Sequence, residues 1–252
     1  MKLTIVVTPG FRKAYEKASN WLKQNPWSSI FLGLPVESEP FVKAYTEERF
    51  GEKEFWRNIS LLTGHTKPFI NSLKLRFQPI LDGIREMYTG NREIHCFQDL
   101  KSCVEESKIQ ERILLLQFRY RATGRLDLNA WKDTLLEEMK GLEDSWRRAT
   151  DRIFEEAQEG AANVVLHGGY LKSTQQLKRP NTGVEIILLE EYWKSPLDTL
   201  RTILWRHGFD RVSNREMGRY LEMQKKYVDL VIQSNDVDAA HEEWTQTVQK
   251  HV

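Results

Sequence analysis

The sequence predicts an α/β fold, with a small and mostly parallel sheet of about five strands and large helical insertions that make it helix-rich overall. Short, continuous apolar runs bounded by turn residues indicate strands that are covered on both faces, as in a parallel sheet. Apolar residues at steps of three and four between these runs indicate amphipathic helices. The expected strands cover residues 3–8, 29–34, 93–97, 163–166 and 183–189.

The first two expected strands and the segment between them form a β-α-β unit. The first strand stops at Pro9-Gly10, and the second stops at Pro35. Between them, apolar residues recur at helical spacing until Asn25-Pro26. Because crossover connections are right-handed, these two strands should be neighbours or near-neighbours, with their carboxyl ends at the same edge of the sheet.

Two helical insertions are expected, at about 37–90 and 108–158. The second contains an apolar stripe from Trp131 to Ala157, on the order of 40 Å long at 1.5 Å per residue. We expect this helix to pack against residues 113–120. We interpret the chain, 1–252, as one α/β domain.

The C-terminal part of the sequence also predicts helices. Apolar residues at helical spacing cover 196–206 and 216–232, followed by a polar tail. We expect these helices to pack on the outer face of the sheet.

The charge balance excludes a strong overall electrostatic field. The 252 residues include 37 Lys and Arg against 36 Asp and Glu, a net charge of +1, so nucleic acid is a disfavoured partner. A mean hydropathy of −0.56 and the lack of a long apolar run predict no membrane partner and a cytoplasmic location. The two cysteines, Cys96 and Cys103, are too few for a disulfide framework and are expected to be reduced thiols.

Residues that follow the expected strands are the candidates for a binding or catalytic site. Open parallel sheets bind ligands in the crevice outside the carboxyl ends of their strands, where helix N-termini also point. The polar and glycine residues at these ends are Thr8, Gly10, Arg12, Glu37, Glu39, Asp99, His167, Gly168, Gly169 and Lys172.

Each of these candidates also has a structural interpretation. Glu37 and Glu39 suit the first turn of a helix, and Asp99 suits a first-turn or N-cap position. His167 ends an apolar run directly before Gly168-Gly169, which predicts an exposed imidazole at a sharp turn. That glycine turn, which leads to Lys172, would suit an anion such as phosphate or carboxylate.

Several known catalytic motifs are absent from the sequence. It contains no G-x-x-x-x-G-K-[ST], no G-x-G-x-x-G after a strand, no G-x-S-x-G, no H-E-x-x-H and no C-x-x-C. A P-loop enzyme, a standard dinucleotide binder and a serine α/β-hydrolase are therefore disfavoured.

The order of elements resembles the TraB/PrgY, erythromycin-esterase and ChaN-like superfamily. The best-matching segment, residues 144–171, reads DSWRRATDRIFEEAQEGAANVVLHGGYL, like the family's charged helix, glycine, apolar strand and His-Gly turn. Residues 76–99 resemble its helix and strand ending in an acid, and Glu37 falls where the family has a strand-end glutamate. The resemblance covers roughly residues 1–190 and implies this fold, a crevice and a hydrolytic ancestry. The family's first strand normally runs into a histidine, whereas Thr8-Pro9-Gly10 follows here, so a site needing two histidines would keep only His167.

The first functional hypothesis is a hydrolase-like enzyme that acts on an ester or amide ligand in this crevice. His167 would be the general base, with Glu37 or Glu39 and Asp99 as orienting carboxylates. If a divalent metal is the cofactor, His167, Glu37 and Glu39 are its expected ligands, a set that suits Mn²⁺, Mg²⁺ or Zn²⁺.

The second hypothesis is a non-catalytic module that binds a small anionic ligand, a protein partner or another copy of the chain. Thr8, Gly10, Arg12, Gly168, Gly169 and Lys172 would hold the ligand. Exposed tryptophans would anchor a protein partner, and the candidates are Trp27, Trp56, Trp193 and Trp244.

A third hypothesis, RNA binding or a nuclease-like role, rests on basic clusters at 119–121, 147–148 and 178–179. Neighbouring acidic residues argue instead that these clusters form salt-bridged surfaces.

Overall fold

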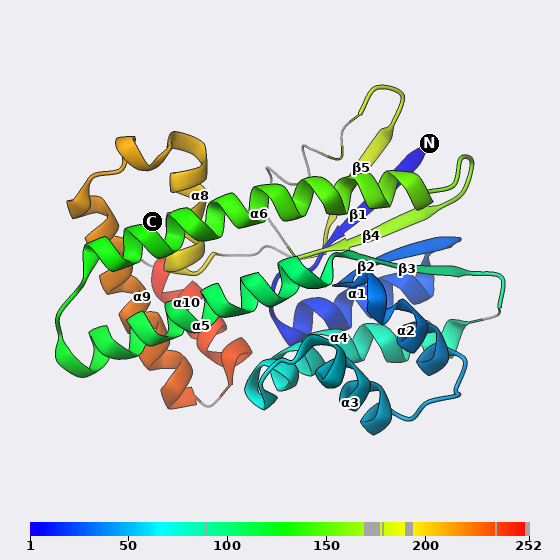
Figure 1. Cartoon of the computed structure of the whole chain (residues 1–252), viewed down its shortest axis with the longest axis horizontal. Coiled ribbons are helices and arrows are strands. Elements are labelled where there is room, and N and C mark those ends of the chain that lie inside the picture. The colour runs from blue at the N-terminus through cyan, green and yellow to red at the C-terminus, as the bar shows by residue number, and fades with distance from the viewer. Residues whose placement is uncertain (89, 169–176, 178, 190–193, 235, 250–252) are drawn as a thin grey trace. The chain divides into compact units, whose positions relative to one another are not determined.

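The computed structural model describes the chain except for residues 89, 169–176, 178, 190–193, 235 and 250–252. The described part contains one five-stranded sheet with the order β3-β2-β4-β1-β5, and each adjacent pair is parallel (Figure 1). The predicted α/β class and the parallel sheet are therefore confirmed. The strands are β1 (Lys2–Val7), β2 (Ser29–Pro35), β3 (Glu93–Gln98), β4 (Asn163–His167) and β5 (Gly183–Leu188).

The centre of the sheet is formed by β4 and β1. Their register places Val6 beside Leu166 and Val7 beside His167. β1 and β2 are near-neighbours, as predicted, with β4 between them. Thr8, which the sequence placed in the first strand, lies just beyond its end.

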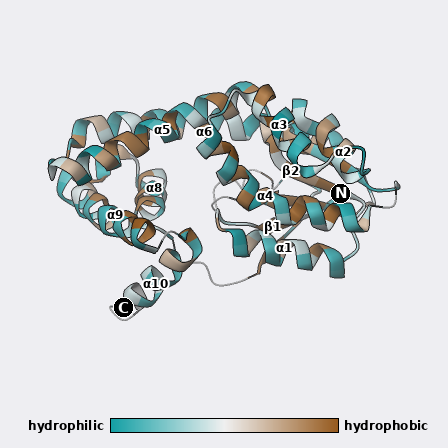
Figure 2. Ribbon diagram, turned by 90° about the horizontal axis from the view of Figure 1, so that it is seen from below, coloured by the Kyte–Doolittle hydropathy of each residue, from teal (hydrophilic) through white to brown (hydrophobic). Residues whose placement is uncertain are grey.

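One face of the sheet, here called the α1 face, is covered by helices that follow β1 and β2. Their apolar residues recur at helical spacing, so each helix has a hydrophobic side (Figure 2). These helices are α1 (Arg12–Gln24), α2 (Glu39–Thr46), α3 (Glu52–Thr63) and α4 (Lys67–Met87), with the short 3₁₀ turn η1 (Val36–Ser38) before α2. The strand residues buried on this face include Val6, Leu32, Leu34, Val164 and Leu166.

The opposite face, here called the α6 face, is covered by the C-terminal part of α6 (Leu128–Glu156). Ala149 and Ile153 of this helix are buried with alternate residues of the strands, as the period of two along a strand requires. The strand residues on this face include Leu3, Ile5, Phe31, Phe97 and Val165.

The internal contacts divide the chain into two compact units. Unit 1 consists of Met1–Ser107 and Glu143–Glu191, and unit 2 of Lys108–Leu142 and Tyr192–Val252. The prediction of a single domain stays a prediction, because compactness does not decide whether two units fold together.

Unit 2 has its own hydrophobic core, built from helices. The expected pairing of residues 113–120 with the long helix is confirmed, since Ile113 is buried in this core with Trp131 and Leu135. The C-terminal helices were expected to pack on the sheet, but they bury Leu200, Leu204 and Leu221 in the same helical core. The further elements are α5 (Leu100–Thr123), α8 (Pro196–His207), η2 (Phe209–Arg211), α9 (Asn214–Ser234) and α10 (Val237–Gln249).

Two properties expected from composition can be compared with the structure. No helix in the described chain is long and apolar enough to cross a membrane. Cys96 and Cys103 are free thiols, as predicted, and burial raises the pKa of Cys96 to about 12.

The expectation of exposed tryptophans is wrong for the three that the structure describes. Trp27, in the turn before β2, and Trp56 of α3 are buried in the core of the α1 face, and Trp244 of α10 is buried against Tyr227 of α9. Trp193 lies outside the described residues.

Asn163 is the polar residue on which the start of β4 depends. Its buried amide donates to the carbonyl oxygens of Lys2, Gln158 and Ala161, and its Oδ1 accepts from the Gln158 amide. We predict that Asn163→Ala lowers the free energy of unfolding by about 2–4 kcal/mol, because buried carbonyls lose their donors. Urea unfolding tests this. Asn71→Ala, at an exposed position, is the control, and it should change the free energy of unfolding by no more than about 0.5 kcal/mol. Equal stability of the two variants would contradict the assignment.

Candidate functional site

The carboxyl ends of β1 and β4 meet directly. The Thr8 amide donates to the His167 carbonyl oxygen at 2.9 Å, which continues the ladder one residue past β1. Side chains alternate along a strand, so Thr8 follows Val6 toward the α1 face and His167 follows Val165 toward the α6 face. The two strand-end side chains are therefore directed to opposite sides of the sheet.

The described residues of the connections that follow these two strands are buried on opposite faces. After β1 it enters α1, whose Ala18 and Leu22 pack on the α1 face. After β4 it passes Leu177, which is buried on the α6 face, before it reaches β5. Such a reversal between adjacent parallel strands is a topological switch point, where open parallel sheets commonly bind their ligands.

Thr8 places a buried hydroxyl at this switch point. The residue is 1 % exposed, and its Oγ1 has no hydrogen-bond partner among the described residues. Burying a hydroxyl without a partner costs roughly 1–3 kcal/mol. A ligand atom that accepts a hydrogen bond from Thr8 would remove this cost.

Gly168 brings the loop after β4 close to Thr8 and α1. A Cβ at this position would lie 3.2 Å from the Thr8 carbonyl oxygen and 3.9 Å from the Tyr15 hydroxyl. A larger residue would crowd the Thr8 backbone. The sequence placed Gly168 at the crevice, but it gave no signal that Tyr15, in the first turns of α1, lies beside it.

The N-terminus of α1 completes this region. Phe11 occupies the N-cap position, where it offers no side-chain cap, and the first turn has no acidic residue. Arg12 and Lys13 begin the helix, and Arg12 Nε also lies 2.8 Å from Glu16 Oε1 on the surface. Gly10 is exposed in the preceding turn. The partial positive charge of a helix N-terminus and two basic residues therefore gather at this end of β1.

Two of the predicted ligand-binding residues, Gly169 and Lys172, lie outside the described residues. Thr8 and Gly168 lie close together at the ends of β1 and β4, and Gly10 and Arg12 follow Thr8 in the turn and at the start of α1.

His167 is buried, contrary to the prediction of an exposed turn residue. It is 4 % exposed, and its ring packs edge-on against Trp146 of α6 with ring centroids 4.2 Å apart. Trp146 in turn contacts Phe97 on the same face. The strand ends only after His167, so the alternation along β4 turns the imidazole into the α6 face instead of toward the loop.

Glu39 closes the free edge of the sheet. β3 is the outermost strand, and the Cys96 amide on it donates to Glu39 Oε2 at 3.0 Å. Glu39 Oε1 accepts from Lys43 Nζ at 2.8 Å. This carboxylate therefore caps an edge amide and pairs with a cation, which matches the structural interpretation more closely than the catalytic one. Glu37 is exposed in η1.

Asp99 is the N-cap of α5. Its carboxylate accepts from the Ser102 amide at 2.8 Å, from the Ser102 hydroxyl at 2.6 Å and from Arg148 Nε at 2.9 Å. Burial raises the pKa of Asp99, but the Ser102 hydrogen bonds and Arg148 outweigh it, so the net pKa lies below the ordinary value. Sequence spacing could not identify Arg148, which comes from another helix.

The expected metal ligands do not assemble. The described residues contain no group of three or more His, Cys, Asp or Glu side chains that could hold a metal ion. His167 faces the α6 side at the centre of the sheet, whereas Glu39 lies on the outer edge of β3. Strand order separates them because β2 and β3 both lie between β4 and that edge.

Comparison with known proteins finds no family model, no curated protein and no solved structure that matches the chain.

The Asp99 cap gives a pH-dependent prediction. Because its pKa is lowered on folding, its contribution to stability is present above the ordinary carboxyl pKa of about 3.9 and is lost as the pH falls through the lower, folded value. We expect Asp99→Ala to destabilise the protein by about 1 kcal/mol at pH 7, and by less below pH 4. Denaturant titrations at both pH values test this. Asp144→Ala, which removes only the exposed pair with Arg147, is the control. A loss from Asp99→Ala that does not change with pH would contradict the account.

Proposed function

We propose that this protein binds a small anionic ligand in the crevice at the carboxyl ends of β1 and β4. The observation that carries the proposal is the switch point itself, where the buried Thr8 hydroxyl has no partner in the described chain and α1 begins. This proposal corresponds to the second hypothesis, a non-catalytic module that binds a small anionic ligand. It needs neither a metal nor a catalytic histidine.

The chemistry of the crevice favours an anion. Helix N-termini attract phosphate and carboxylate groups because their amides and dipole present positive charge. Arg12 and Lys13 add two cations, of which Arg12 also pairs with Glu16, and the first turn of α1 has no acidic residue. A ligand oxygen that accepts from Thr8 would gain a hydrogen bond to a charged group, worth about 1.5–3 kcal/mol.

The close approach of Gly168 supports the same site. The loop after β4 passes near the Thr8 carbonyl oxygen and the Tyr15 hydroxyl, so the ligand would be bordered by backbone on one side and α1 on the other. Backbone that approaches closely without a side chain is typical of phosphate-binding turns.

The hydrolase hypothesis has weaker support. His167 packs on the α6 face, Glu39 bonds the Cys96 amide, and Asp99 caps α5, so the three side chains make separate structural contacts. A hydrolytic activity, a divalent metal and membership of the TraB/PrgY, erythromycin-esterase and ChaN-like superfamily stay predictions.

A pair of isosteric substitutions tests the binding proposal. Thr8→Val removes the hydroxyl at the switch point, and we expect it to weaken binding of inorganic phosphate or sulfate by about tenfold or more. Thr150→Val is a matched control, because Thr150 of α6 is also buried and its Oγ1 also lacks a partner in the described chain. Isothermal titration calorimetry at constant ionic strength measures both.

The control separates binding from folding. Both substitutions remove an unpartnered buried hydroxyl, so neither should lower the melting temperature. The site would be rejected if Thr8→Val bound phosphate and sulfate as tightly as the wild-type protein does. It would also be rejected if the wild-type protein bound neither anion.

A further inference from the structure

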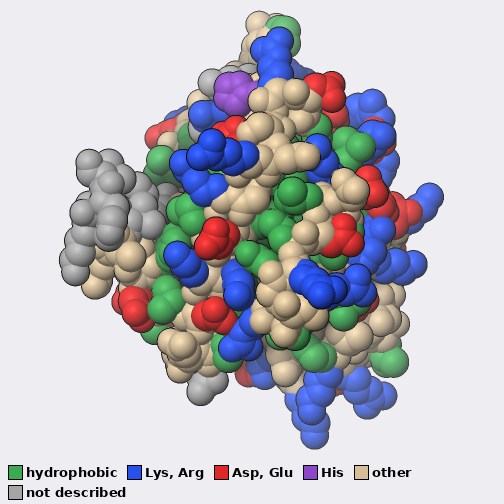
Figure 3. Space-filling view, turned by 90° about the vertical axis from the view of Figure 1, so that its left-hand side faces the viewer, with side chains coloured by type: hydrophobic (Ala, Val, Ile, Leu, Met, Phe, Trp, Pro, Cys, Tyr) green, Lys and Arg blue, Asp and Glu red, His purple; other side chains and the backbone are tan. Residues whose placement is uncertain are grey.

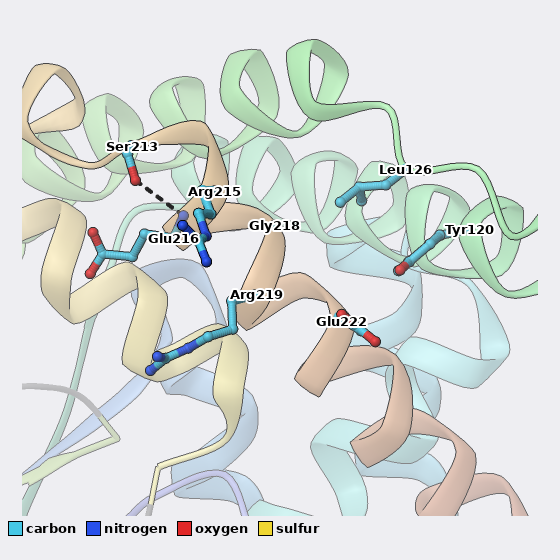
Figure 4. Close-up of a pocket in the computed structure, with 8 residues that line it drawn as sticks. All are labelled: Tyr120, Leu126, Ser213, Arg215, Glu216, Gly218, Arg219 and Glu222. Atoms are coloured by element: carbon cyan, nitrogen blue, oxygen red, sulfur yellow. Dashed lines mark hydrogen bonds between the residues drawn. The ribbon is translucent and has the colours of Figure 1, made fainter.

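Unit 2 contains a pocket of about 800 Å³ between the N-terminal half of α9 and the end of α5. Figure 4 shows its two ends. Ser213, Arg215 and Glu216 lie at one end, and Tyr120, Leu126 and Glu222 lie at the other. The Arg219 side chain is directed away from Tyr120 and Leu126. The pocket therefore has its two arginines and Glu216 on one side, and an aromatic ring, an aliphatic side chain and Glu222 on the other.

The two arginines of the pocket differ from the buried arginine of the same unit. Arg201 is held by Glu138 at 2.6 Å and by Asp198 at 2.9 Å, and these charges outweigh the effect of burial on its pKa, which is raised. Arg215 and Arg219 have no ion pair with an acidic residue among the described residues.

The two arginines are neighbours on α9, and Glu216 and Glu222 lie three residues before and after Arg219, which also contacts the Tyr220 ring at 5.4 Å. Arg215 and Arg219 are four residues apart on α9 and both are exposed, so they lie one turn apart on the same side of the helix. Like charges at this spacing repel each other by a few tenths of a kcal/mol. An oxyanion bound between them would replace the repulsion by charge-assisted hydrogen bonds, for which the guanidinium group is well suited.

The other end of the pocket is shaped to contact an apolar group. Gly218 of α9 faces Leu126, whose Cδ2 would lie 3.8 Å from a Cβ at the glycine. The absence of a side chain at this position keeps the surface beside Leu126 open. The Tyr120 ring is held by Lys225, whose Nζ is 5.2 Å from the ring centroid.

We infer that this pocket binds a small ligand with an oxyanion at one end and an aromatic or aliphatic group at the other. The oxyanion, a phosphate or a carboxylate, lies between Arg215 and Arg219. The apolar group lies against Leu126 and Tyr120. This site is separate from the proposed site of unit 1 and does not depend on it.

The acidic residues of the pocket disfavour an extended polyanion such as RNA. Glu216 and Glu222 also line it, and they would repel successive phosphates. The face of the molecule at the left of Figure 1 has the same mixed character, since acidic side chains lie among its Lys, Arg and hydrophobic ones (Figure 3).

Three probes test the inference on the full chain: phenyl phosphate, inorganic phosphate and phenol. We expect phenyl phosphate to bind with the highest affinity, because only this probe occupies both ends of the pocket. Exchanging both arginines, with Arg215→Gln and Arg219→Gln, should weaken phenyl phosphate binding by about tenfold or more. Lys226→Gln removes an exposed cation of the same helix that does not line the pocket, and it should leave the affinity unchanged.

Calorimetry with each variant gives a decisive result, and circular dichroism checks that α9 is intact. Glutamine has nearly the helix propensity of arginine, so the variants should fold. Equal weakening by Lys226→Gln would show a general charge effect and overturn the inference. Absence of phenyl phosphate binding would overturn it as well. Binding that is lost with Thr8→Val but kept in the double arginine variant would place the ligand in unit 1 and also reject this pocket.

Discussion

The parallel pairing of β1 with β4 is the contact on which the arrangement of unit 1 depends. With this strand order, the connection from β1 to β2 and the connection from β4 to β5 run in opposite directions across the sheet. Because crossovers are right-handed, the two connections must lie on opposite faces. α1 therefore covers one face, and Leu177 is buried on the other. The switch point at Thr8 and Gly168 follows from this topology and not from any single side chain.

The alternation of side chains along a strand is one reason why the predicted catalytic residues do not lie together. Val7 pairs with His167 across β1 and β4, so these two side chains share one side of the sheet. Side chains alternate along a strand, so the next residue, Thr8, faces the other side although its amide is hydrogen-bonded to His167. The carboxylates are fixed by other local requirements. Glu39 bonds an edge amide of β3, and Asp99 bonds the first turn of α5. What remains at the switch point is a site suited to holding an anion.

Much of the fold could be predicted from the sequence, because hydrophobic periodicity is a local signal. The strands, the helix with Trp131 and its pairing with Ile113 were all predicted in this way. The strand order could not be predicted, since it depends on contacts between distant segments. For this reason the burial of His167 against Trp146 and the pairing of Asp99 with Arg148 gave no sequence signal, and no sequence motif distinguishes the pocket residues Arg215 and Arg219.

The most direct test of the central claim is a titration of the ¹⁵N-labelled protein with inorganic phosphate, followed by the chemical shifts of its backbone amides. The account predicts that the largest saturable shifts occur at Thr8, Arg12, Lys13 and Gly168, since these amides surround the crevice. Shifts in unit 1 that avoid these residues, or the absence of any saturable shift there, would contradict it.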